Sequence, residues 1–190
     1  MALLTEHSGP LASASILIDD TPSVTTYEIR RKARRIKRHG LDLIVVDYLQ
    51  RLTPADRRRE RYEQVGEMAR DLKELSREMD VPVLCLAQLS READKGGTPT
   101  LAWLRESGNI EQEADVVAFL KTDKRTKAGT THDDAETEKP STLMIVKNRN
   151  GEEGDFALRW IPYRTLFECD EQAQGELESP IGFQEFNGYA

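Results

Sequence analysis

Apolar residues gather in short runs that are separated by amphipathic or polar stretches. The runs 41–46 and 81–87 are almost continuously apolar, a pattern that favours strands buried on both faces of a parallel sheet. Between them, apolar side chains recur at steps of three and four residues from Val65 to Met79, which predicts an amphipathic helix. This part of the chain is therefore predicted to form a strand, a helix and a second strand.

Another strand and helix are predicted upstream. Residues 15–18 indicate a short buried strand, which the turn formers of residues 19–22 close. A helix follows, with Thr25 or Thr26 as its N-terminal cap and Gly40 at its end. This alternation of strands and helices predicts an α/β domain with right-handed crossovers.

The second half of the chain is predicted to be richer in strands. The stretch 121–140 is polar and has no periodicity, so a solvated loop is expected there. Asn150-Gly151 is a dipeptide that favours hairpin turns, and apolar runs lie on both sides of it. The predicted strands of this half are 115–120, 143–146, 156–161 and 163–169.

The composition is that of a globular chain without a membrane span. Hydrophobic residues make up 38% and charged residues 32% of the 190 residues, and no apolar run approaches the roughly 18 residues that a membrane helix needs. We expect no secretory signal, no membrane partner and a cytoplasmic location. Cys85 and Cys169 lack the paired spacing of a metal site and are interpreted as buried thiols.

Charge changes sign along the chain. The net charge of −7 opposes nucleic-acid binding, but residues 1–61 carry 12 Lys and Arg against 8 Asp and Glu, whereas the rest carry 15 against 26. The first third is therefore +4 and the remainder −11. The basic residues of the first third lie in the helix around 30–38, where a solvated face is the ordinary explanation, and in the stretch 51–61.

Two polar residues end the two central strands. Asp47 follows the apolar run 43–46, and Gln88 follows the run 81–87. In an open parallel sheet, ligands bind beyond the carboxyl ends of the strands, so an acid and an amide there suit a magnesium-bound nucleotide. The alternatives are a turn-forming aspartate and a polar cap at a strand end.

Lys147 and Arg149 lie two residues apart at a predicted strand end, so they project to the same side. A guanidinium supplied across an interface stabilises the charge on a transferring phosphoryl group. Charge placement alone leaves open that the pair is a solvated shoulder of the hairpin.

Five motifs together resemble the replicative DNA helicases of the DnaB family, and Ile18 to Pro22 agrees with it as well. The resemblance covers about residues 13–169 and follows the order of motifs in that family. The motifs are Asp47-Tyr48-Leu49-Gln50, the helix Glu63 to Leu75, Val81-Pro82-Val83 leading to Gln88-Leu89-Ser90-Arg91, Leu104 to Asp115, and Lys147 to Gly151.

The resemblance implies a partial RecA-like P-loop ATPase core, with a mostly parallel sheet, flanking helices and a C-terminal β-hairpin. Residues 1–12 would be an N-terminal extension, 13–169 the helicase domain and 170–190 an acidic tail. The implied cofactors are ATP and Mg²⁺, and the implied assembly is a hexameric ring that unwinds DNA 5′-to-3′ with single-stranded DNA in its channel. Primase or a helicase loader would be further partners.

The resemblance also implies roles for individual residues. Asp47 would be the Walker B carboxylate that holds magnesium directly or through water, and Gln88 the sensor of the γ-phosphate. Lys147 and Arg149 would reach the nucleotide of the neighbouring subunit, with Arg149 as the arginine finger. DNA contacts would come from two channel loops, through Arg57, Arg58 and Arg59 in one and Arg105, Glu106 and Gly108 in the other.

One motif of the family does not occur among the 190 residues. There is no Gly-x-x-x-x-Gly-Lys-Ser/Thr, so the phosphate cradle and its lysine must come from elsewhere, for example from a P-loop-bearing partner chain. We therefore expect the chain alone to be inactive as an ATPase, and sheet edges to be left unpaired. The alternatives are a non-catalytic protein that binds a helicase ring or single-stranded DNA, and a remnant without activity.

Overall fold

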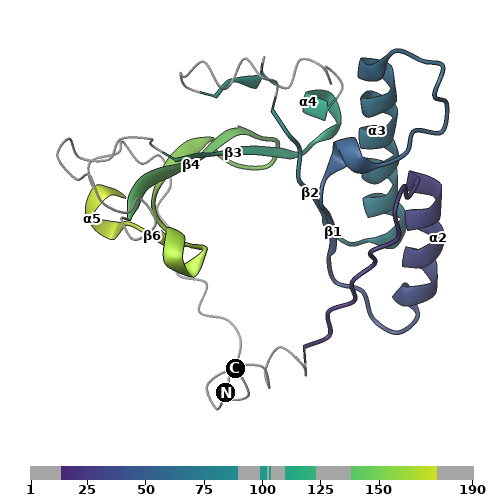
Figure 1. Ribbon diagram of the computed structural model, residues 1–190, viewed down its shortest axis with the longest axis horizontal. Helices are drawn as coiled ribbons and strands as arrows, with labels where there is room; N and C mark the ends of the chain where they lie inside the picture. The colour runs from purple at the N-terminus through teal and green to yellow at the C-terminus, as the bar shows by residue number, and fades with distance from the viewer. Residues whose placement is uncertain (1–13, 90–98, 102, 104–109, 123–137, 175–190) are drawn as a thin grey trace.

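Two lobes and a short helix between them make up the fold of the computed structural model (Figure 1), which describes residues 14–89, 99–101, 103, 110–122 and 138–174. The helical lobe, residues 14–89, holds α2 (Thr26–Lys37), β1 (Ile44–Val46), η1 (Leu49–Arg51), α3 (Arg61–Met79) and β2 (Val83–Cys85). The strand lobe, residues 115–122 and 138–174, holds β3 (Val116–Thr122), β4 (Lys139–Asn148), β5 (Gly154–Ile161), η4 (Pro162–Arg164), β6 (Leu166–Cys169) and α5 (Glu171–Gln174). Helix α4 (Ile110–Glu113) lies between the lobes.

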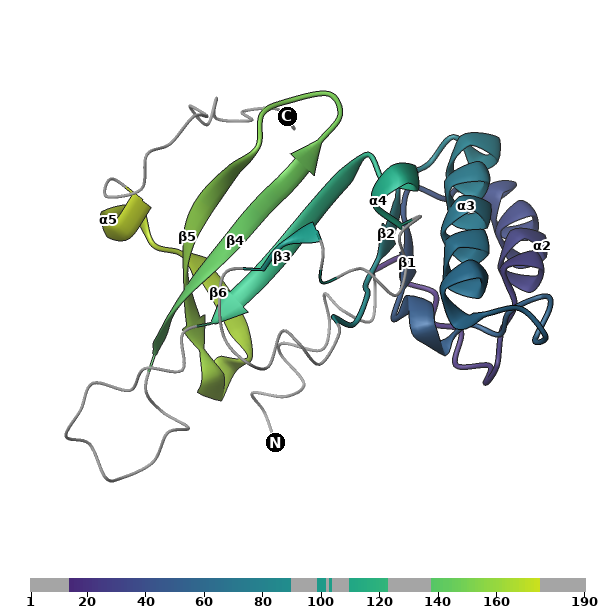
Figure 2. The same ribbon diagram turned by 90° about the horizontal axis from the view of Figure 1, so that it is seen from above.

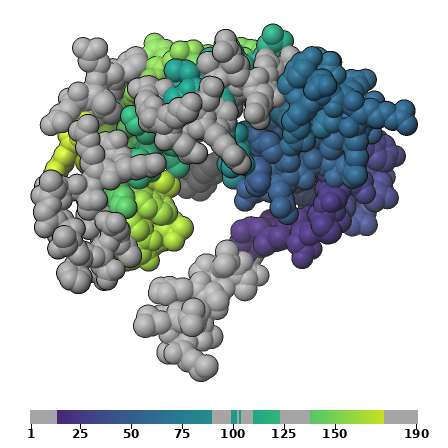
Figure 3. All heavy atoms as spheres, turned by 45° about the horizontal axis from the view of Figure 1, so that its top comes forward, coloured from purple at the N-terminus to yellow at the C-terminus, as the bar shows by residue number. Residues whose placement is uncertain are grey.

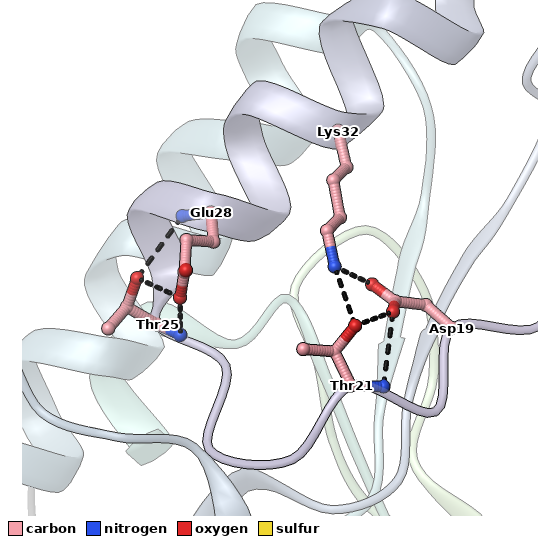
Figure 4. A network of polar contacts seen from close by, with 5 residues as sticks. All are labelled: Asp19, Thr21, Thr25, Glu28 and Lys32. Atoms are coloured by element: carbon pink, nitrogen blue, oxygen red, sulfur yellow. Dashed lines mark hydrogen bonds and ion pairs between the residues drawn. The ribbon is translucent and has the colours of Figure 1, made fainter.

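Helix α2 begins where the sequence predicts and ends at Lys37, three residues before the predicted Gly40. Thr25 forms a capping box with Glu28: the Glu28 N–H donates to Thr25 Oγ1 at 3.2 Å, and the Thr25 N–H donates to Glu28 Oε2 at 2.9 Å (Figure 4). Three residues after the helix, Gly40 has a φ of +102°, a conformation that suits glycine because it lacks a Cβ atom.

The Arg-rich surface of α2 is partly neutralised by its neighbours. Arg30 and Arg34 form ion pairs with Glu78 of α3, and Arg30 also pairs with Glu74. Lys32 donates to Asp19 Oδ2 and to Thr21 Oγ1, which fastens the preceding loop to the helix (Figure 4). A large part of the positive charge of α2 therefore serves to hold the helical lobe together.

Helix α3 carries the main core. Its apolar stripe packs under α2 and against the β1–β2 sheet, and Met68, Leu72 and Leu75 are almost fully buried. The predicted spacing of three and four residues between buried apolar side chains is confirmed. The helix begins at Arg61, four residues before Val65, the first residue of the predicted pattern.

Strands β1 and β2 form a parallel pair that is covered on one side only. Ile44, Val45 and Val46 pair with Val83, Leu84 and Cys85, and the strands are shorter than the predicted runs. Val46 faces the core, whereas the cross-strand neighbours Val45 and Leu84 are 56% and 52% exposed. In Figure 2 the helices α2 and α3 lie on the same side of this sheet. Among the described residues the expected unpaired edges are therefore present, and the structure also leaves one apolar face of this sheet open.

The prediction of a buried strand at residues 15–18 is wrong. Ile16, Leu17 and Ile18 are 61%, 74% and 88% exposed, and they pair with no strand in the part of the chain that the structure describes. An apolar run forms a buried strand only where a neighbouring strand shares its hydrogen bonds, and among the described strands β1 pairs with β2 alone.

The strand lobe is a four-stranded antiparallel sheet in the order β3-β4-β5-β6. It contains the predicted hairpin, with β4 and β5 joined through residues 149–153, and extends it on both sides. Among the described residues the sheet structure is therefore less parallel than expected, with two parallel strands and four antiparallel ones. Residues 149–153 and 162–165, which join β4 to β5 and β5 to β6, are connections too short for a crossover, so these neighbours are antiparallel.

Several predicted features lie outside the described residues or differ in burial. Most of the predicted loop 121–140 and most of the acidic tail lie outside the described residues. Cys85 is half-buried, and burial raises the pKa of its thiol to about 11, as an inert thiol requires. Cys169, interpreted as buried, is exposed, because it ends the edge strand β6, which has a neighbouring strand on one flank only. No described helix is long and apolar enough to cross a membrane.

Figure 3 shows the helical lobe and the strand lobe on either side of a hollow. Their apolar clusters are separate, and Ile110 of α4 packs against both of them. Helix α4 is therefore the apolar junction of the two lobes.

Candidate functional site

Asp47 and Gln88 meet at one rim of the β1–β2 sheet. Both follow the carboxyl ends of the two parallel strands, and they line one open pocket together with Tyr48, Leu86 and Ala87. Both side chains are exposed toward solvent, and the Asp47–Tyr48 peptide is cis. The juxtaposition that the strand pattern predicts is therefore present.

Gln50 fastens Gln88 in place. The Gln50 Nε2–H donates to the Gln88 carbonyl oxygen at 3.0 Å, and the Gln88 N–H donates to Gln50 Oε1 at 3.1 Å. The Leu49 N–H also donates to Leu86 O at 2.9 Å, so the two chain segments remain joined beyond the strands. The backbone of Gln88 is therefore fixed by residues of the segment that follows β1, the segment to which Asp47 also belongs.

The Arg-rich stretch after β1 is a loop with both ends anchored on α3. Arg61 Nη2 donates to Gln50 O at 3.0 Å, and the buried Gln64 donates through Nε2 to Arg59 O at 2.8 Å. Within the loop, the Arg58 N–H donates to Asp56 Oδ1 at 2.9 Å. These bonds hold a short loop that projects from the start of α3.

The three predicted DNA contacts of this loop differ in how free they are. Arg59 lies 3.8 Å from Asp56 and 3.5 Å from Glu67, so its guanidinium is partly engaged. Arg57 and Arg58 are exposed, and their side chains form no ion pair among the described residues. They are the more available cations for a phosphate backbone. Arg105, Glu106 and Gly108, the predicted contacts of the second DNA loop, lie outside the described residues.

Lys147 and Arg149 lie away from the Asp47 pocket, against α4. Arg149 Nη1 donates to Asp115 Oδ1 at 3.0 Å and its Nη2 donates to Gln112 O at 3.0 Å. Lys147 Nζ donates to Glu111 O. The two cations do project to one side of the strand end, as predicted, and that side is covered by α4.

Asp115 connects this pair to α3. Its carboxylate accepts from Lys73 of α3 through one oxygen and from Arg149 through the other. The hydrogen bond from Lys73 lowers the pKa of Asp115, and the charges of Lys73 and Arg149 lower it further. Asp115 therefore stays ionised between two cations.

The residues at the rim suit the cofactors that the sequence implies. Magnesium at nucleotide sites is held by one or two carboxylates together with phosphate oxygens and water, and Asp47 presents one exposed carboxylate with Gln88 beside it. Among the described residues no three His, Cys, Asp or Glu side chains form a cluster that would hold a metal alone. The donor set fits an ion that brings its own phosphate ligands.

Sequence reasoning missed Gln50, Asp115 and Lys73 as site residues. Gln50 and Asp115 are both part of quoted motifs, but no periodicity or charge pattern says which strand end or which cation they contact. Lys73 lies 42 residues before Asp115, and nothing in its local sequence sets it apart from the other cations of α3.

Comparison with solved structures places the fold among DnaB-like ATPase domains. The chain superimposes on one solved structure, "ATPase Domain of G40P", with a TM-score of 0.77 and 32% identity, over 90% of this chain and 60% of that one. A second, "The Structure Of A DnaB-Like Replicative Helicase And Its Interactions With Primase", gives a TM-score of 0.74 and 33% identity, over 84% of this chain and 38% of that one.

The family model for the DnaB-like helicase C-terminal domain matches residues 1–169, and the chain belongs to this family. It is 41% identical over 183 residues to the replicative DNA helicase DnaB of Geobacillus stearothermophilus and 42% identical over 185 residues to the replicative DNA helicase DnaC of Bacillus subtilis (strain 168). Both alignments cover 94% of this chain and 39% of the relative. The chain thus spans about two-fifths of the length of these relatives.

Proposed function

We propose that the chain is the C-terminal part of an ATP-dependent replicative DNA helicase that unwinds duplex DNA 5′-to-3′ as a hexameric ring. The observation that carries the proposal is the pocket that Asp47 and Gln88 share at the carboxyl ends of two parallel strands, in a chain that belongs to the DnaB-like family. Ligands of open α/β sheets bind at this edge. The phosphate cradle has to be supplied by a segment that is not among these 190 residues.

In this proposal Asp47 holds Mg²⁺, directly or through water. Its carboxylate is exposed at the pocket and is the only acidic side chain among the described residues that line it. Bound magnesium and ATP supply the reaction chemistry, in which charge on the transferring phosphoryl group is neutralised. Asp47 would fix the position of the magnesium ion that neutralises this charge.

In this proposal the side chain of Gln88 senses whether the γ-phosphate is present. An amide presents both a donor and an acceptor, so it can bind a phosphate oxygen or orient a water. Its backbone is held by Gln50, which leaves the side chain free to turn toward the pocket.

Arg149, with Lys147, acts on the nucleotide of a neighbouring subunit. Neither residue is among those that line the pocket of Asp47 and Gln88, which favours action in trans. An arginine finger contributes about 10³ to 10⁵ in rate because it stabilises charge that develops in the transition state.

Single-stranded DNA would be contacted by the loop that carries Arg57, Arg58 and Arg59, and by Arg105, Glu106 and Gly108 of the second loop. The anchored ends of the first loop hold its exposed cations in the segment that leads from the carboxyl end of β1 to α3. Primase or a helicase loader would be further partners. A similar solved structure is that of a DnaB-like replicative helicase and its interactions with primase, which supports the first of these.

A chimera tests the proposal. In it, this chain replaces the matching region of the Geobacillus relative, so that the P-loop is supplied in the same polypeptide. We expect DNA-stimulated ATP hydrolysis that Asp47→Asn abolishes and that Asp42→Asn, an exposed carboxylate at the other end of β1, leaves intact.

The opposite result supports a different function. A chimera that assembles and binds DNA but hydrolyses no ATP would favour the non-catalytic alternative, a protein that binds a helicase ring or single-stranded DNA. Hydrolysis by the 190-residue chain alone, abolished by Asp47→Asn, would contradict the assignment of the phosphate cradle to another segment.

A further inference from the structure

Arg149 is held on its own chain by three bonds from one short segment. Its backbone N–H donates to Asp115 O at 2.8 Å, Nη1 to Asp115 Oδ1 at 3.0 Å and Nη2 to Gln112 O at 3.0 Å. Two terminal nitrogens with two different acceptors fix both the position and the plane of a guanidinium. A solvated arginine on a hairpin would have neither fixed.

The segment that holds Arg149 is itself anchored. Asp115 Oδ2 accepts from Lys73, whose side chain is 15% exposed, and Glu113 pairs with Arg70 at 3.3 Å. Ile110 packs into the apolar clusters of both lobes. The segment 110–115 is therefore tied to α3 by two ion pairs, one from Glu113 of α4 and one from Asp115, and to each lobe by the apolar contact of Ile110.

Lys147 is oriented by the same segment. It donates to Glu111 O, and Arg149 donates to Gln112 O, so both cations cap carbonyl groups that the end of α4 leaves without a helical partner. The two side chains leave β4 and its turn on the same side because they are two residues apart. One short helix thus receives both of the cations that the proposed function assigns to the neighbouring nucleotide.

The guanidinium of Arg149 has N–H donors that these contacts do not use. A guanidinium has five N–H groups, and the side-chain contacts of Arg149 use two of them. The side chain is 45% exposed, so the remaining N–H groups can donate to a phosphate oxygen without breaking the contact with Asp115. Arg149 can therefore keep its contact with Asp115 while it binds a phosphate oxygen.

We propose that Asp115 is a positioning residue for Arg149: its carboxylate, fixed by Lys73, sets the orientation in which the guanidinium meets the nucleotide of the neighbouring subunit. This inference rests on the proposed function, because it assumes that Arg149 acts on a nucleotide. In this proposal Asp115 contacts neither nucleotide nor DNA. Its contribution passes entirely through Arg149.

The first experiment measures the contact on the 190-residue chain without any activity. Urea unfolding of wild type, Asp115→Ala, Arg149→Ala and the double variant gives the coupling between the two side chains. We expect the double variant to shift the midpoint by less than the sum of the single shifts. Glu113→Ala, which removes the neighbouring ion pair with Arg70, is the control and should show additive shifts with Arg149→Ala. Additive shifts for Asp115 and Arg149 would overturn the proposal.

The second experiment measures positioning in the chimera described above. Arg149→Ala should lower kcat by about 10³-fold or more. Asp115→Ala should lower kcat by about tenfold to a hundredfold, with little change in KM for ATP, because a misplaced group loses part of its effect on the transition state. In the double variant kcat should equal that of Arg149→Ala, and Asp115→Glu should recover part of the loss.

The outcomes separate this inference from the proposed function. Multiplicative losses in the double variant would mean that Asp115 acts independently of Arg149, which overturns the inference while leaving the finger in place. If Arg149→Ala has no effect on kcat, the proposed function of Arg149 fails. If the parent chimera is inactive, that result counts against the proposed function, and the unfolding cycle still decides whether the positioning contact exists.

Discussion

The side-chain amide of Gln50 forms hydrogen bonds with both backbone groups of Gln88, donating to the carbonyl oxygen at 3.0 Å and accepting from the N–H at 3.1 Å. In effect the side chain continues the β1–β2 ladder past the end of the strands. The two residues belong to segments that follow different strands, and their bond holds the acid and the amide of the pocket in a fixed relation.

Gln50→Ala should loosen the backbone of Gln88. Both of its hydrogen bonds to Gln50 are lost, and each such bond contributes on the order of 1 kcal/mol or less at an exposed position. Hydrogen exchange read by NMR should show that the Gln88 amide exchanges faster, while the amides of α3 keep their rates. Gln172→Ala, at an exposed glutamine of α5, should leave Gln88 unchanged. Equal exchange of Gln88 in wild type and Gln50→Ala would mean that the bond does not hold this segment in solution.

Arg57→Ala combined with Arg58→Ala should weaken binding of single-stranded DNA and flatten its salt dependence. Each phosphate contact contributes a slope of about −0.7 in log K against log salt, so the double variant should lose one to two contacts. Fluorescence anisotropy titrations at several salt concentrations measure the slope. The matched control is Arg31→Ala with Arg35→Ala, two exposed arginines of α2. An unchanged slope in the loop variant, or an equal change in the α2 variant, would assign the loop to solvent.

Asp19→Asn should make the protein less sensitive to acid. Hydrogen bonds from Lys32 and Thr21 lower the pKa of Asp19 from 3.8 to about 2 (Figure 4). A carboxyl group whose pKa is lower in the folded state stabilises the fold above its unfolded pKa, and that contribution is lost as the pH falls from about 4 to about 2. Urea midpoints over this range should therefore fall less steeply in Asp19→Asn than in wild type. The neighbouring Asp20→Asn serves as the control, and identical profiles for wild type and Asp19→Asn would show that the Lys32 contact does not persist in solution.

Val45→Thr with Leu84→Thr should reduce self-association of the chain. These cross-strand neighbours are 56% and 52% exposed on the open face of the β1–β2 sheet, and an uncovered apolar face with free strand edges favours pairing with a second copy. Sedimentation velocity at increasing concentration should show a smaller associated fraction in the variant. The control, Val116→Thr with Leu120→Thr, changes two exposed apolar residues of β3. If both double variants behave alike, association does not depend on the open sheet face.

Local pattern was sufficient for the elements that local interactions form. The three- and four-residue period of α3 follows from which side chains must face the core. Thr25 and Glu28 specify the start of α2 through bonds within one turn, and Gly40 allows the backbone turn that follows the helix. The adjacency of Asp47 and Gln88 could be predicted as well, because parallel strands end at the same edge.

Tertiary structure decided what depends on partners far away in the chain. Residues 15–18 have the composition of a buried strand, yet they are exposed because no described strand pairs with them, a property of the neighbours and not of the run itself. Gln50 could not be matched to Gln88, nor Lys73 to Asp115, because bonds across 38 and 42 residues leave no periodic mark in a sequence. The charge of Arg149 was evident from the sequence, but its direction is set by a carboxylate 34 residues upstream that only the packing of α4 between the two lobes brings into reach.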